Sequence, residues 1–359
     1  MKTIHAIVVL SIGMLSVSRL YAQPVHFEDP NLKGAVETRL GLTEPNSEDM
    51  LRLEVLTADN LGITDLTGLE YALNLTRLRL YNNDIADISP LQNLAKIKYL
   101  VLGSNDIVDV SPLGGMLQLT ELHVSGNRIH DISSLVTLTS LERLNLAWND
   151  NITDIGVITA WPNLYYIYFD GSPIGDYETN LDILSELTHL QDLGIANCDI
   201  PNLNFLSELH NLKYLALFNN SLTDISTLAN LTELETLRLN INGITDVSAL
   251  LDLHHLLSLE IQDNSLSQEA YCEQIPQIIR NNPDMILEID ANPYFPYYPG
   301  DLPGTGCGVD MEDLILLISF WLDELPPNQS EYDLAPEIGD GRIDFQDFAV
   351  LAQDWLKQM

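Results

Sequence analysis

The stretch LRLYNNDIADISPL, residues 78–91, contains the pattern that decides the fold. Leu78 and Leu80 alternate with Arg79 and Tyr81, and asparagine, isoleucine and aspartate follow. Alternation of apolar and polar residues predicts a short strand with one buried face. The asparagine amide can bond backbone groups where the chain leaves the strand. One such segment cannot bury its own apolar face, so neighbouring copies must complete the core.

Near-copies of this stretch recur at an almost constant spacing. The apolar residue after the asparagine position marks each copy: Ile63, Ile85, Ile107, Ile129, Ile152, Ile174, Ile200, Leu222, Ile244 and Leu266. Successive copies are 22 residues apart, except for one gap of 23 and one of 26 residues. This period, with the consensus L-x-x-L-x-L-x-x-N-x-I-x-D-I-x-x-L-x-x-L, is typical of leucine-rich repeats. We therefore predict an α/β fold, a right-handed solenoid with a parallel concave sheet.

The polar residues of the repeat have structural roles in this prediction. The asparagine position holds Asn83, Asn105, Asn127, Asn149, Asn220, Asn242 and Asn264. Cys198 and Ser172 take this position in two copies, and we expect Cys198 to be buried in the ladder rather than to act as a nucleophile. The aspartate of the repeated I-x-D-I phrase is expected to cap a helical turn on the convex side.

The segments that flank the repeats divide the chain further. Residues 1–22 have the positive start, apolar stretch and small-residue end of a secretory signal peptide, with an uncleaved anchor as the alternative. Residues 23–55 are predicted to form a helical N-terminal cap, with helices that begin near Asp29-Pro30 and Ser47. Residues 56–290 hold the repeats and a C-terminal cap, which consists of a helical cover and a final strand.

The capped repeats resemble the leucine-rich repeat domains of internalin-like bacterial surface proteins. The opening repeat GITDLTGLEYALNLTRL, residues 62–78, carries the resemblance, which covers about residues 25–290. The resemblance implies a secreted or cell-surface protein whose concave sheet binds an extracellular protein or glycan. It does not identify the partner, because this family differs chiefly at exposed positions.

The outward residues of the predicted strands form the candidate ligand surface. They include Arg79, Tyr81, His123, Asn145, Trp148, Tyr168, Asp170, Phe218, Arg238 and Asn240. The four aromatic residues among them are typical anchors for a partner, although they can also simply pack against one another. Tyr165, Tyr166 and Trp161 lie near the same coils. The 26-residue gap contains an insertion, which we expect to bulge beside this surface.

Charge and motifs exclude several classes of function. The chain has 52 acidic and 16 basic residues, a net charge of −36. Such a charge repels nucleic acid and anionic membrane surfaces. Beyond the signal peptide no apolar run reaches the length of a membrane helix. We find no Ser-His-Asp spacing, zinc motif or phosphate loop, so we do not expect an enzyme. A structural spacer without a ligand on the repeats is the alternative to a binding protein.

The C-terminal residues have a different composition. Residues 291–303 are rich in Pro, Tyr and Gly and are predicted to form a linker. Residues 304–359 contain two similar phrases, GCGVDMEDLILLISFWL and GDGRIDFQDFAVLAQDWL, each a Gly-Asp loop that leads into an amphipathic helix. They resemble a small, all-α dockerin-type domain. That resemblance implies bound calcium and attachment to a cohesin-like module or to the cell surface.

The resemblance to a dockerin-type domain also implies which residues bind calcium. They are Asp333, Asp340, Asp344 and Asp347 in the second loop, and Asp301, Asp310 and Asp313 in the first. Pro336 and Ile338 stand where the second loop should have acids, and Cys307 replaces the bend glycine of the first. Calcium is therefore predicted mainly for the second loop, and a helical pair held together by its apolar residues is the alternative. Cys307 is also a possible disulfide partner of Cys272.

Overall fold

The computed structural model describes residues 23–149, 152–174 and 178–290. The chain divides into two units, which we call unit 1, up to Ile200, and unit 2, from Pro201 onward. The predicted signal peptide, linker and dockerin-like domain lie outside the described residues.

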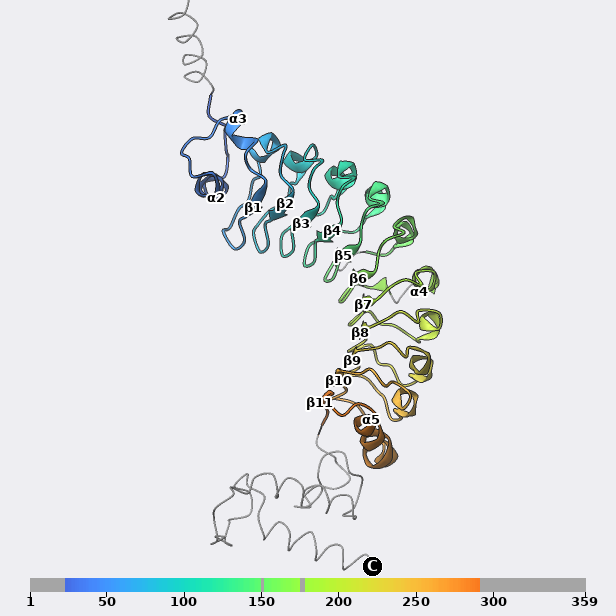
Figure 1. Cartoon of the computed structure of the whole chain (residues 1–359). Coiled ribbons are helices and arrows are strands. Elements are labelled where there is room, and N and C mark those ends of the chain that lie inside the picture. The colour runs from blue at the N-terminus through green and yellow to red at the C-terminus, as the bar shows by residue number, and fades with distance from the viewer. Residues whose placement is uncertain (1–22, 150–151, 175–177, 291–359) are drawn as a thin grey trace, which may run out of the picture. The chain divides into compact units, whose positions relative to one another are not determined.

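Unit 1 is built from successive coils, each with a three-residue strand and a helical turn on the opposite side (Figure 1). Its strands are β1 (Val55–Thr57), β2 (Arg77–Arg79), β3 (Tyr99–Val101), β4 (Glu121–His123), β5 (Arg143–Asn145), β6 (Tyr166–Tyr168) and β7 (Asp192–Gly194). Neighbouring strands are parallel and in register, so the central leucines Leu78, Leu100 and Leu122 lie side by side and are fully buried. The parallel sheet of repeats predicted from the 22-residue period is confirmed.

Short helices occupy the other side of the coils in unit 1. They are the 3-10 helices η1 (Leu69–Tyr71), η2 (Ser89–Leu91), η3 (Ser111–Gly115), η4 (Ser133–Thr137) and η5 (Gly156–Ala160), and the α-helix α4 (Glu178–Ser185). The repeated aspartates act just before these turns, since Asp109 Oδ1 accepts the Ser111 backbone N–H at 2.8 Å. This bond, with one from the serine hydroxyl, lowers the pKa of Asp109. The aspartate thus lies one residue before the N-cap rather than at it.

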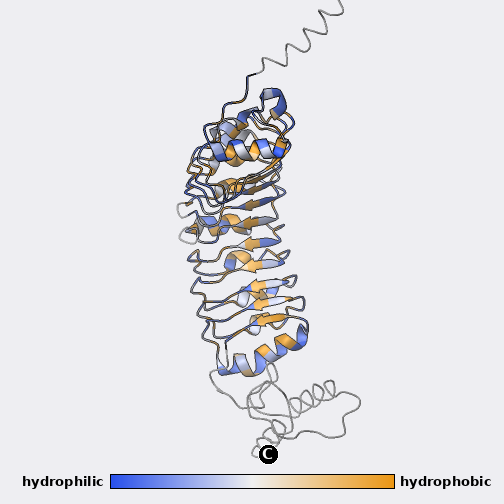
Figure 2. Cartoon of the chain, turned by 90° about the vertical axis from the view of Figure 1, so that its left-hand side faces the viewer, coloured by the Kyte–Doolittle hydropathy of each residue, from blue (hydrophilic) through white to orange (hydrophobic). Residues whose placement is uncertain are grey.

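Unit 2 continues the same construction. Its strands β8 (Tyr214–Ala216), β9 (Thr236–Arg238), β10 (Ser258–Glu260) and β11 (Ile286–Glu288) are parallel, and the 3-10 helices η7 (Asn204–Leu206), η8 (Ser226–Asn230) and η9 (Ser248–Leu250) precede them. The π-helix η10 (Ala270–Gln274) runs into α5 (Ile275–Asn281) and forms the predicted helical cover. Figure 2 shows α5 banded with polar and apolar residues, as expected of a helix that covers a core.

The N-terminal cap of unit 1 has the two predicted helices, α2 (Pro30–Leu40) and α3 (Ser47–Met50). Asp29 caps α2 and also accepts the Thr64 backbone N–H at 2.8 Å, which ties the cap to the first coil. Burial raises the pKa of Asp29, but its hydrogen bonds to backbone N–H groups outweigh this and leave the pKa lowered. Asn46 and Asp49 form a capping box at the start of α3.

The asparagines of the repeat join each coil to the preceding one. Asn105 Oδ1 accepts the Ile85 backbone N–H at 3.0 Å, and its Nδ2 donates to the Leu80 carbonyl of the preceding coil at 3.0 Å. Equivalent bonds are made by Asn83, Asn127 and Asn149 in unit 1, and by Asn242 and Asn264 in unit 2. These bonds satisfy backbone groups that the apolar core would otherwise leave unpaired.

Cys198 occupies the ladder position that the repeat predicts. Its Sγ is buried and donates to the carbonyl of Phe169 at 3.3 Å and to that of Ala196 at 3.2 Å. Burial raises the pKa of the Cys198 thiol to about 12, so the thiolate that a nucleophile needs is absent at neutral pH. Cys272 is disulfide-bonded, and its candidate partner Cys307 lies outside the described residues.

Candidate ligand-binding surface

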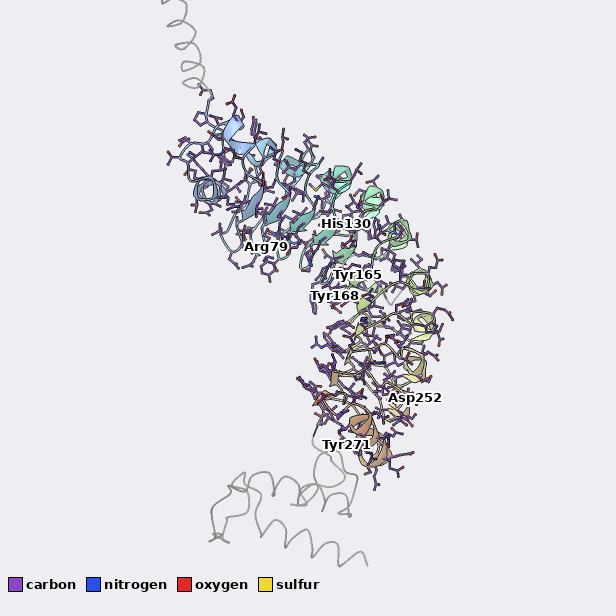
Figure 3. All side chains as sticks on the ribbon, in the orientation of Figure 1. Arg79, His130, Tyr165, Tyr168, Asp252 and Tyr271 are labelled. Atoms are coloured by element: carbon purple, nitrogen blue, oxygen red, sulfur yellow. The ribbon has the colours of Figure 1, made fainter. Side chains whose placement is uncertain are left out.

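The strands of unit 1 present two rows of side chains on the side opposite the helical turns, which we call the strand face. The first row is Arg77, Tyr99, Glu121, Arg143 and Tyr166, and the second is Arg79, Val101, His123, Asn145 and Tyr168. Register pairing places successive members of a row side by side. Figure 3 labels Arg79 and Tyr168 on this face.

The predicted ligand surface does not include the first row, of which only Tyr166 was placed near the same coils. The predicted surface began at the residue between the two inward leucines, for example Arg79 between Leu78 and Leu80. A strand has a period of two, so Arg77 must share the face of Arg79. The missing signal was therefore present in the sequence, one position before each L-x-L.

Two arginines hold Tyr99 at the β2–β3 end of the strand face. The guanidinium of Arg77 lies over the Tyr99 ring, 4.3 Å from its centroid. Arg79 Nη1 donates to the Tyr99 hydroxyl at 3.2 Å, while Arg79 Nη2 bonds Asp59 at 2.8 Å. The Asp59 carboxylate raises the pKa of Arg79 and keeps its charge fixed. The Tyr99 ring is consequently held before any ligand arrives.

His123 links Tyr99 to the aromatic residues of β6. The His123 ring centroid is 6.1 Å from that of Tyr99 and 6.4 Å from that of Tyr166. His123 Nε2 is 2.7 Å from Glu121 Oε1, and the same oxygen lies 3.6 Å from Arg143 Nε. The three rings and their charged neighbours thus form one continuous group across β3–β6.

Tyr166 and Tyr168 form the other end of this group. Their rings are stacked, with centroids 4.3 Å apart and an interplanar angle of 17°. The Arg143 guanidinium lies 4.2 Å from the Tyr166 centroid. Burial raises the pKa of Tyr166, so its hydroxyl stays protonated and able to donate. We call Tyr99, His123, Tyr166 and Tyr168, with Arg77 and Arg143 over their rings, the aromatic row.

Glycines make room for two aromatic rings of unit 1. A Cβ on Gly171 would lie 2.3 Å from the Trp148 ring, and one on Gly194 would lie 2.8 Å from the Tyr168 ring. Trp148 is 53% exposed and has a φ of 57°, a left-handed conformation that a bulky residue rarely adopts. Asn82, Ser104 and Gly126 have the same conformation at the equivalent position of the preceding coils, so it belongs to the repeat turn, and the exposed ring alone makes Trp148 a candidate binding residue.

Other predicted surface residues have structural partners. Asn145 Oδ1 accepts the Ala147 backbone N–H at 3.0 Å, and Asp170 Oδ1 accepts that of Ala196 at 2.8 Å. The Tyr81 ring lies beside Gly103, where a Cβ would be 3.3 Å from it. These residues shape the strand face without joining the aromatic row.

Phe218, Arg238 and Asn240 belong to unit 2 and form a separate group there. The Arg238 guanidinium lies 4.9 Å from the Phe218 centroid, and its Nε bonds Glu260 at 2.7 Å. The Oδ1 atom of Asn240 is buried, and no described residue donates a hydrogen bond to it. The predicted surface therefore divides between the two units, and its larger aromatic part lies in unit 1.

Two features near these coils lie away from the strand face. The described part of the insertion forms α4 beside η5 on the side of the helical turns, and not the bulge that was expected next to the strand face (Figure 1). Leu181 and Leu184 of α4 are buried, which explains why the insertion packs there. Trp161 is fully buried and donates through Nε1 to the Leu135 carbonyl at 3.1 Å, so it belongs to the core.

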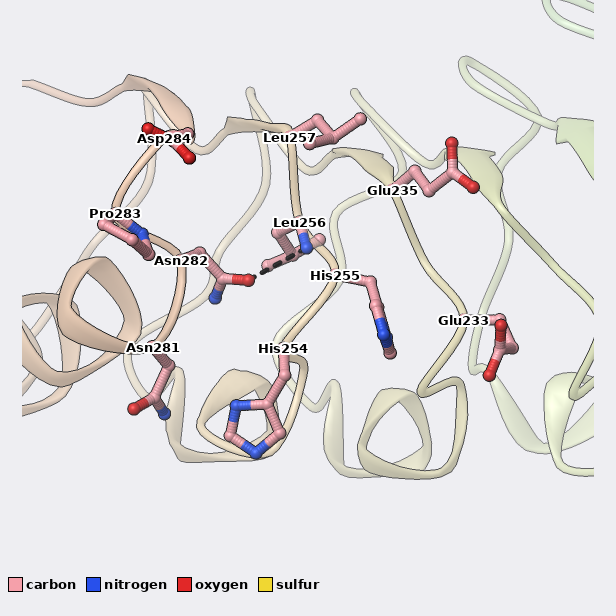
Figure 4. Close-up of a pocket in the computed structure, with 10 residues that line it drawn as sticks. All are labelled: Glu233, Glu235, His254, His255, Leu256, Leu257, Asn281, Asn282, Pro283 and Asp284. Carbon is pink, nitrogen blue, oxygen red and sulfur yellow. Dashed lines mark hydrogen bonds between the residues drawn. The ribbon is translucent and has the colours of Figure 1, made fainter.

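Unit 2 also has an open pocket (Figure 4), which none of the predicted site residues lines. It is formed by Glu233, Glu235, His254, His255, Leu256, Leu257, Asn281, Asn282, Pro283 and Asp284. Several of these groups serve the fold: Asn282 Oδ1 accepts the Leu256 N–H at 2.9 Å, and Glu235 bonds Lys213 at 2.9 Å. The pocket therefore has an acidic lining, but its side chains do not indicate a particular reaction.

Metal and membrane features can be assessed only for the described residues. Within residues 23–149, 152–174 and 178–290, no cluster of three or more His, Cys, Asp or Glu side chains is arranged to hold a metal ion. In the same ranges no helix has both the length and the apolar character needed to span a bilayer. The seven candidate calcium ligands, Asp301, Asp310, Asp313, Asp333, Asp340, Asp344 and Asp347, all lie outside these ranges.

The chain contains leucine-rich repeats. A family model described as leucine-rich repeats in two copies matches residues 73–115, 117–163 and 210–252. No curated protein matches the chain.

Solved structures with the same architecture include internalins. An internalin (inlF) from Listeria monocytogenes is 27% identical, with a TM-score of 0.54, over 76% of this chain and 94% of the other. The functional domain of InlJ from Listeria monocytogenes, which includes a cysteine ladder, is 23% identical over 74% of this chain and 60% of that one, with a TM-score of 0.56. A leucine-rich repeat protein of Leptospira interrogans is 22% identical over 67% of this chain and 62% of that one, with a TM-score of 0.56. The last two share the fold alone, while the first makes the chain internalin-like in structure.

Proposed function

We propose that the chain is an extracellular binding protein that recognises a partner protein through the strand face of unit 1. The aromatic row is the observation that supports this function. Tyrosine and arginine are enriched among residues that dominate binding energy. Here their rings and guanidinium groups are already fixed against one another, which lowers the entropy cost of ordering them on binding.

The proposed location and attachment come from the chain ends. The signal-like residues 1–22 and the likeness to internalins support export and display outside the cell. The dockerin-like residues 304–359 attach the protein to a cohesin-like module or to the cell surface. A scaffold of this kind needs no catalytic group, which agrees with the proposed roles of binding and attachment.

Substituting the stacked pair tests the binding role. We expect Tyr166→Ser with Tyr168→Ser to weaken affinity for the captured partner by about 100-fold or more, because each ring is expected to be a binding hot spot worth about 2 kcal/mol. The full chain is immobilised, partners are captured from extracellular and envelope fractions, and the affinity of the purified partner is measured for each variant.

Two further variants make that comparison decisive. Tyr71→Ser alters a tyrosine that is 43% exposed on η1, away from the strand face, and should leave affinity unchanged. Trp148→Ser removes a ring that is 53% exposed, so its loss leaves the core intact. Equal affinity of all variants would favour the spacer alternative, in which the repeats have no ligand.

Calcium binding by the tail is tested separately. We expect the full chain to bind calcium in an isothermal titration and to lose attachment to its docking partner when a chelator is added. Asp340→Ala with Asp344→Ala should abolish binding in the second loop, whereas Asp84→Ala, outside the tail, should have no effect. Attachment that persists in chelator would contradict the calcium-dependent role.

A further inference from the structure

The arginines on the strands differ in whether the protein itself supplies a counter-charge. Arg79 bonds Asp59 at 2.8 Å in unit 1, and Arg238 bonds Glu260 at 2.7 Å in unit 2. Arg143 has Glu121 at 3.6 Å. Each of these three positive charges therefore has a nearby carboxylate.

Arg77 lacks such a partner. It is exposed, and none of the described residues forms an ion pair with it. Its register neighbours are Val55 on β1 and Tyr99 on β3, neither of which is acidic. Acidic residues outnumber basic ones in this chain by 52 to 16, so a strand-face arginine without a carboxylate is unexpected.

Arg77 is nevertheless held in place. Its guanidinium lies 4.3 Å from the centroid of Tyr99, and Tyr99 is fixed by its bond from Arg79 at 3.2 Å. A guanidinium that stacks through its face keeps the N–H groups along its edges for a ligand. Those donors match the two oxygens of a carboxylate, which arginine binds in a bidentate manner.

We propose that Arg77 is the receptor for a carboxylate on the partner protein, contributed by an Asp or Glu side chain whose neighbouring apolar residue packs on Tyr99 and His123. This inference rests on the proposed binding function and specifies the partner's chemistry. The Tyr99 and His123 rings, 6.1 Å apart, supply the apolar surface next to the charge.

The surrounding charge favours a single carboxylate over a polyanion. Asp59 and Glu121 flank the Arg77–Tyr99 pair through their bonds to Arg79 and His123. A dense polyanion, such as an acidic polysaccharide, would place several charges against them and against a chain of net charge −36. One carboxylate on an otherwise neutral peptide segment makes the contact with Arg77 and avoids this repulsion.

A display selection with random peptides tests the inference. The full chain is immobilised in about 0.3 M salt, which screens the long-range field of the protein. Peptides are selected in parallel on the unchanged chain, on Arg77→Gln, on Arg77→Lys and on Arg128→Gln. The last is the matched control, since Arg128 is 69% exposed, lies outside the strands and already pairs with Asp106.

We expect the unchanged chain to select peptides with an acidic residue next to an aromatic or aliphatic one. Their affinity should fall by about 10-fold to 100-fold on Arg77→Gln and by less on Arg77→Lys, which keeps the charge but not the flat donor pair. Affinity for Arg128→Gln should remain unchanged. Peptides without a shared acid, or with equal affinity for Arg77→Gln, overturn the inference.

The same experiment separates this inference from the function on which it rests. The selected peptides are also measured on the chain with Tyr166→Ser and Tyr168→Ser. If they depend on these tyrosines but not on Arg77, the strand face binds proteins and only the carboxylate assignment fails. If no peptide is selected, or selection ignores the aromatic row, both fail. Tighter binding of an oligouronate than of any peptide would assign Arg77 to a glycan and overturn the inference.

Discussion

Asn127→Ala is expected to lower the free energy of unfolding by about 2–4 kcal/mol, since it leaves several buried backbone groups unpaired. Asn127 Oδ1 accepts the Ile107 N–H at 3.0 Å, and its Nδ2 donates to Leu102 at 3.0 Å and Val124 at 2.9 Å. Water cannot replace these bonds without opening the core between two coils. Urea unfolding followed by circular dichroism measures the change.

Arg128→Ala serves as the neighbouring control. Arg128 lies beside Asn127 but is 69% exposed, so its loss should change stability by no more than about 0.5 kcal/mol. If Asn127→Ala and Arg128→Ala had the same stability, the ladder would not be what joins the coils.

Gly171→Ala is expected to reduce stability by about 1–3 kcal/mol and to displace Trp148. The new Cβ would lie 2.3 Å from the Trp148 ring, and the φ of 71° at Gly171 disfavours any side chain. Both effects act in the turns that follow the strands, where Gly171 and Trp148 lie. Urea unfolding gives the change in stability, and tryptophan fluorescence reports the altered environment of Trp148.

Gly62→Ala isolates the contribution of the ring. Gly62 has a φ of 65°, close to that of Gly171, but its Cβ would meet only Asp84 Oδ2 at 3.7 Å. Gly62→Ala should therefore lose the stability that a side chain at positive φ costs, without the steric clash and without a change in fluorescence. If the two variants behaved alike, the space above Gly171 would not be what holds the Trp148 ring in place.

The repeat unit could be predicted from the sequence because its physics is local. Alternating leucines specify the inward face of each strand, and the 22-residue period places them in register, as at Leu78 and Leu100. Asn105 was recognisable because a buried turn needs a side chain that both donates and accepts. Even Cys198 followed from its position in the repeat.

The surface was harder to predict because it depends on contacts between coils. Arg77 and Tyr99 are in contact although they lie 22 positions apart in the sequence. Neither residue occupies a consensus position of the repeat. The length of the insertion did not reveal which side of the coil would hold it. The spacing of Leu181 and Leu184 indicates one apolar helix face, and this signal would have placed α4 in the core layer.

The division of the predicted surface between unit 1 and unit 2 also depends on contacts between side chains of different coils. The sequence groups Trp148, Tyr168 and Phe218 as exposed aromatics, but spacing alone does not show which of them touch. Contacts in unit 1 instead select Tyr166 as the neighbour of Tyr168, with their rings 4.3 Å apart. The period of two places Tyr166 and Tyr168 on one face, but the contact between their rings is found only in the folded chain.

Hydroxyl-radical footprinting of the full chain tests whether the partner binds to the strand face of unit 1. Oxidation of each tyrosine is measured by mass spectrometry with and without the captured partner. We predict that the partner protects Tyr99, Tyr166 and Tyr168 but leaves Tyr71 on η1 as reactive as before. Protection of Tyr71 together with unchanged oxidation of the other three would contradict the account.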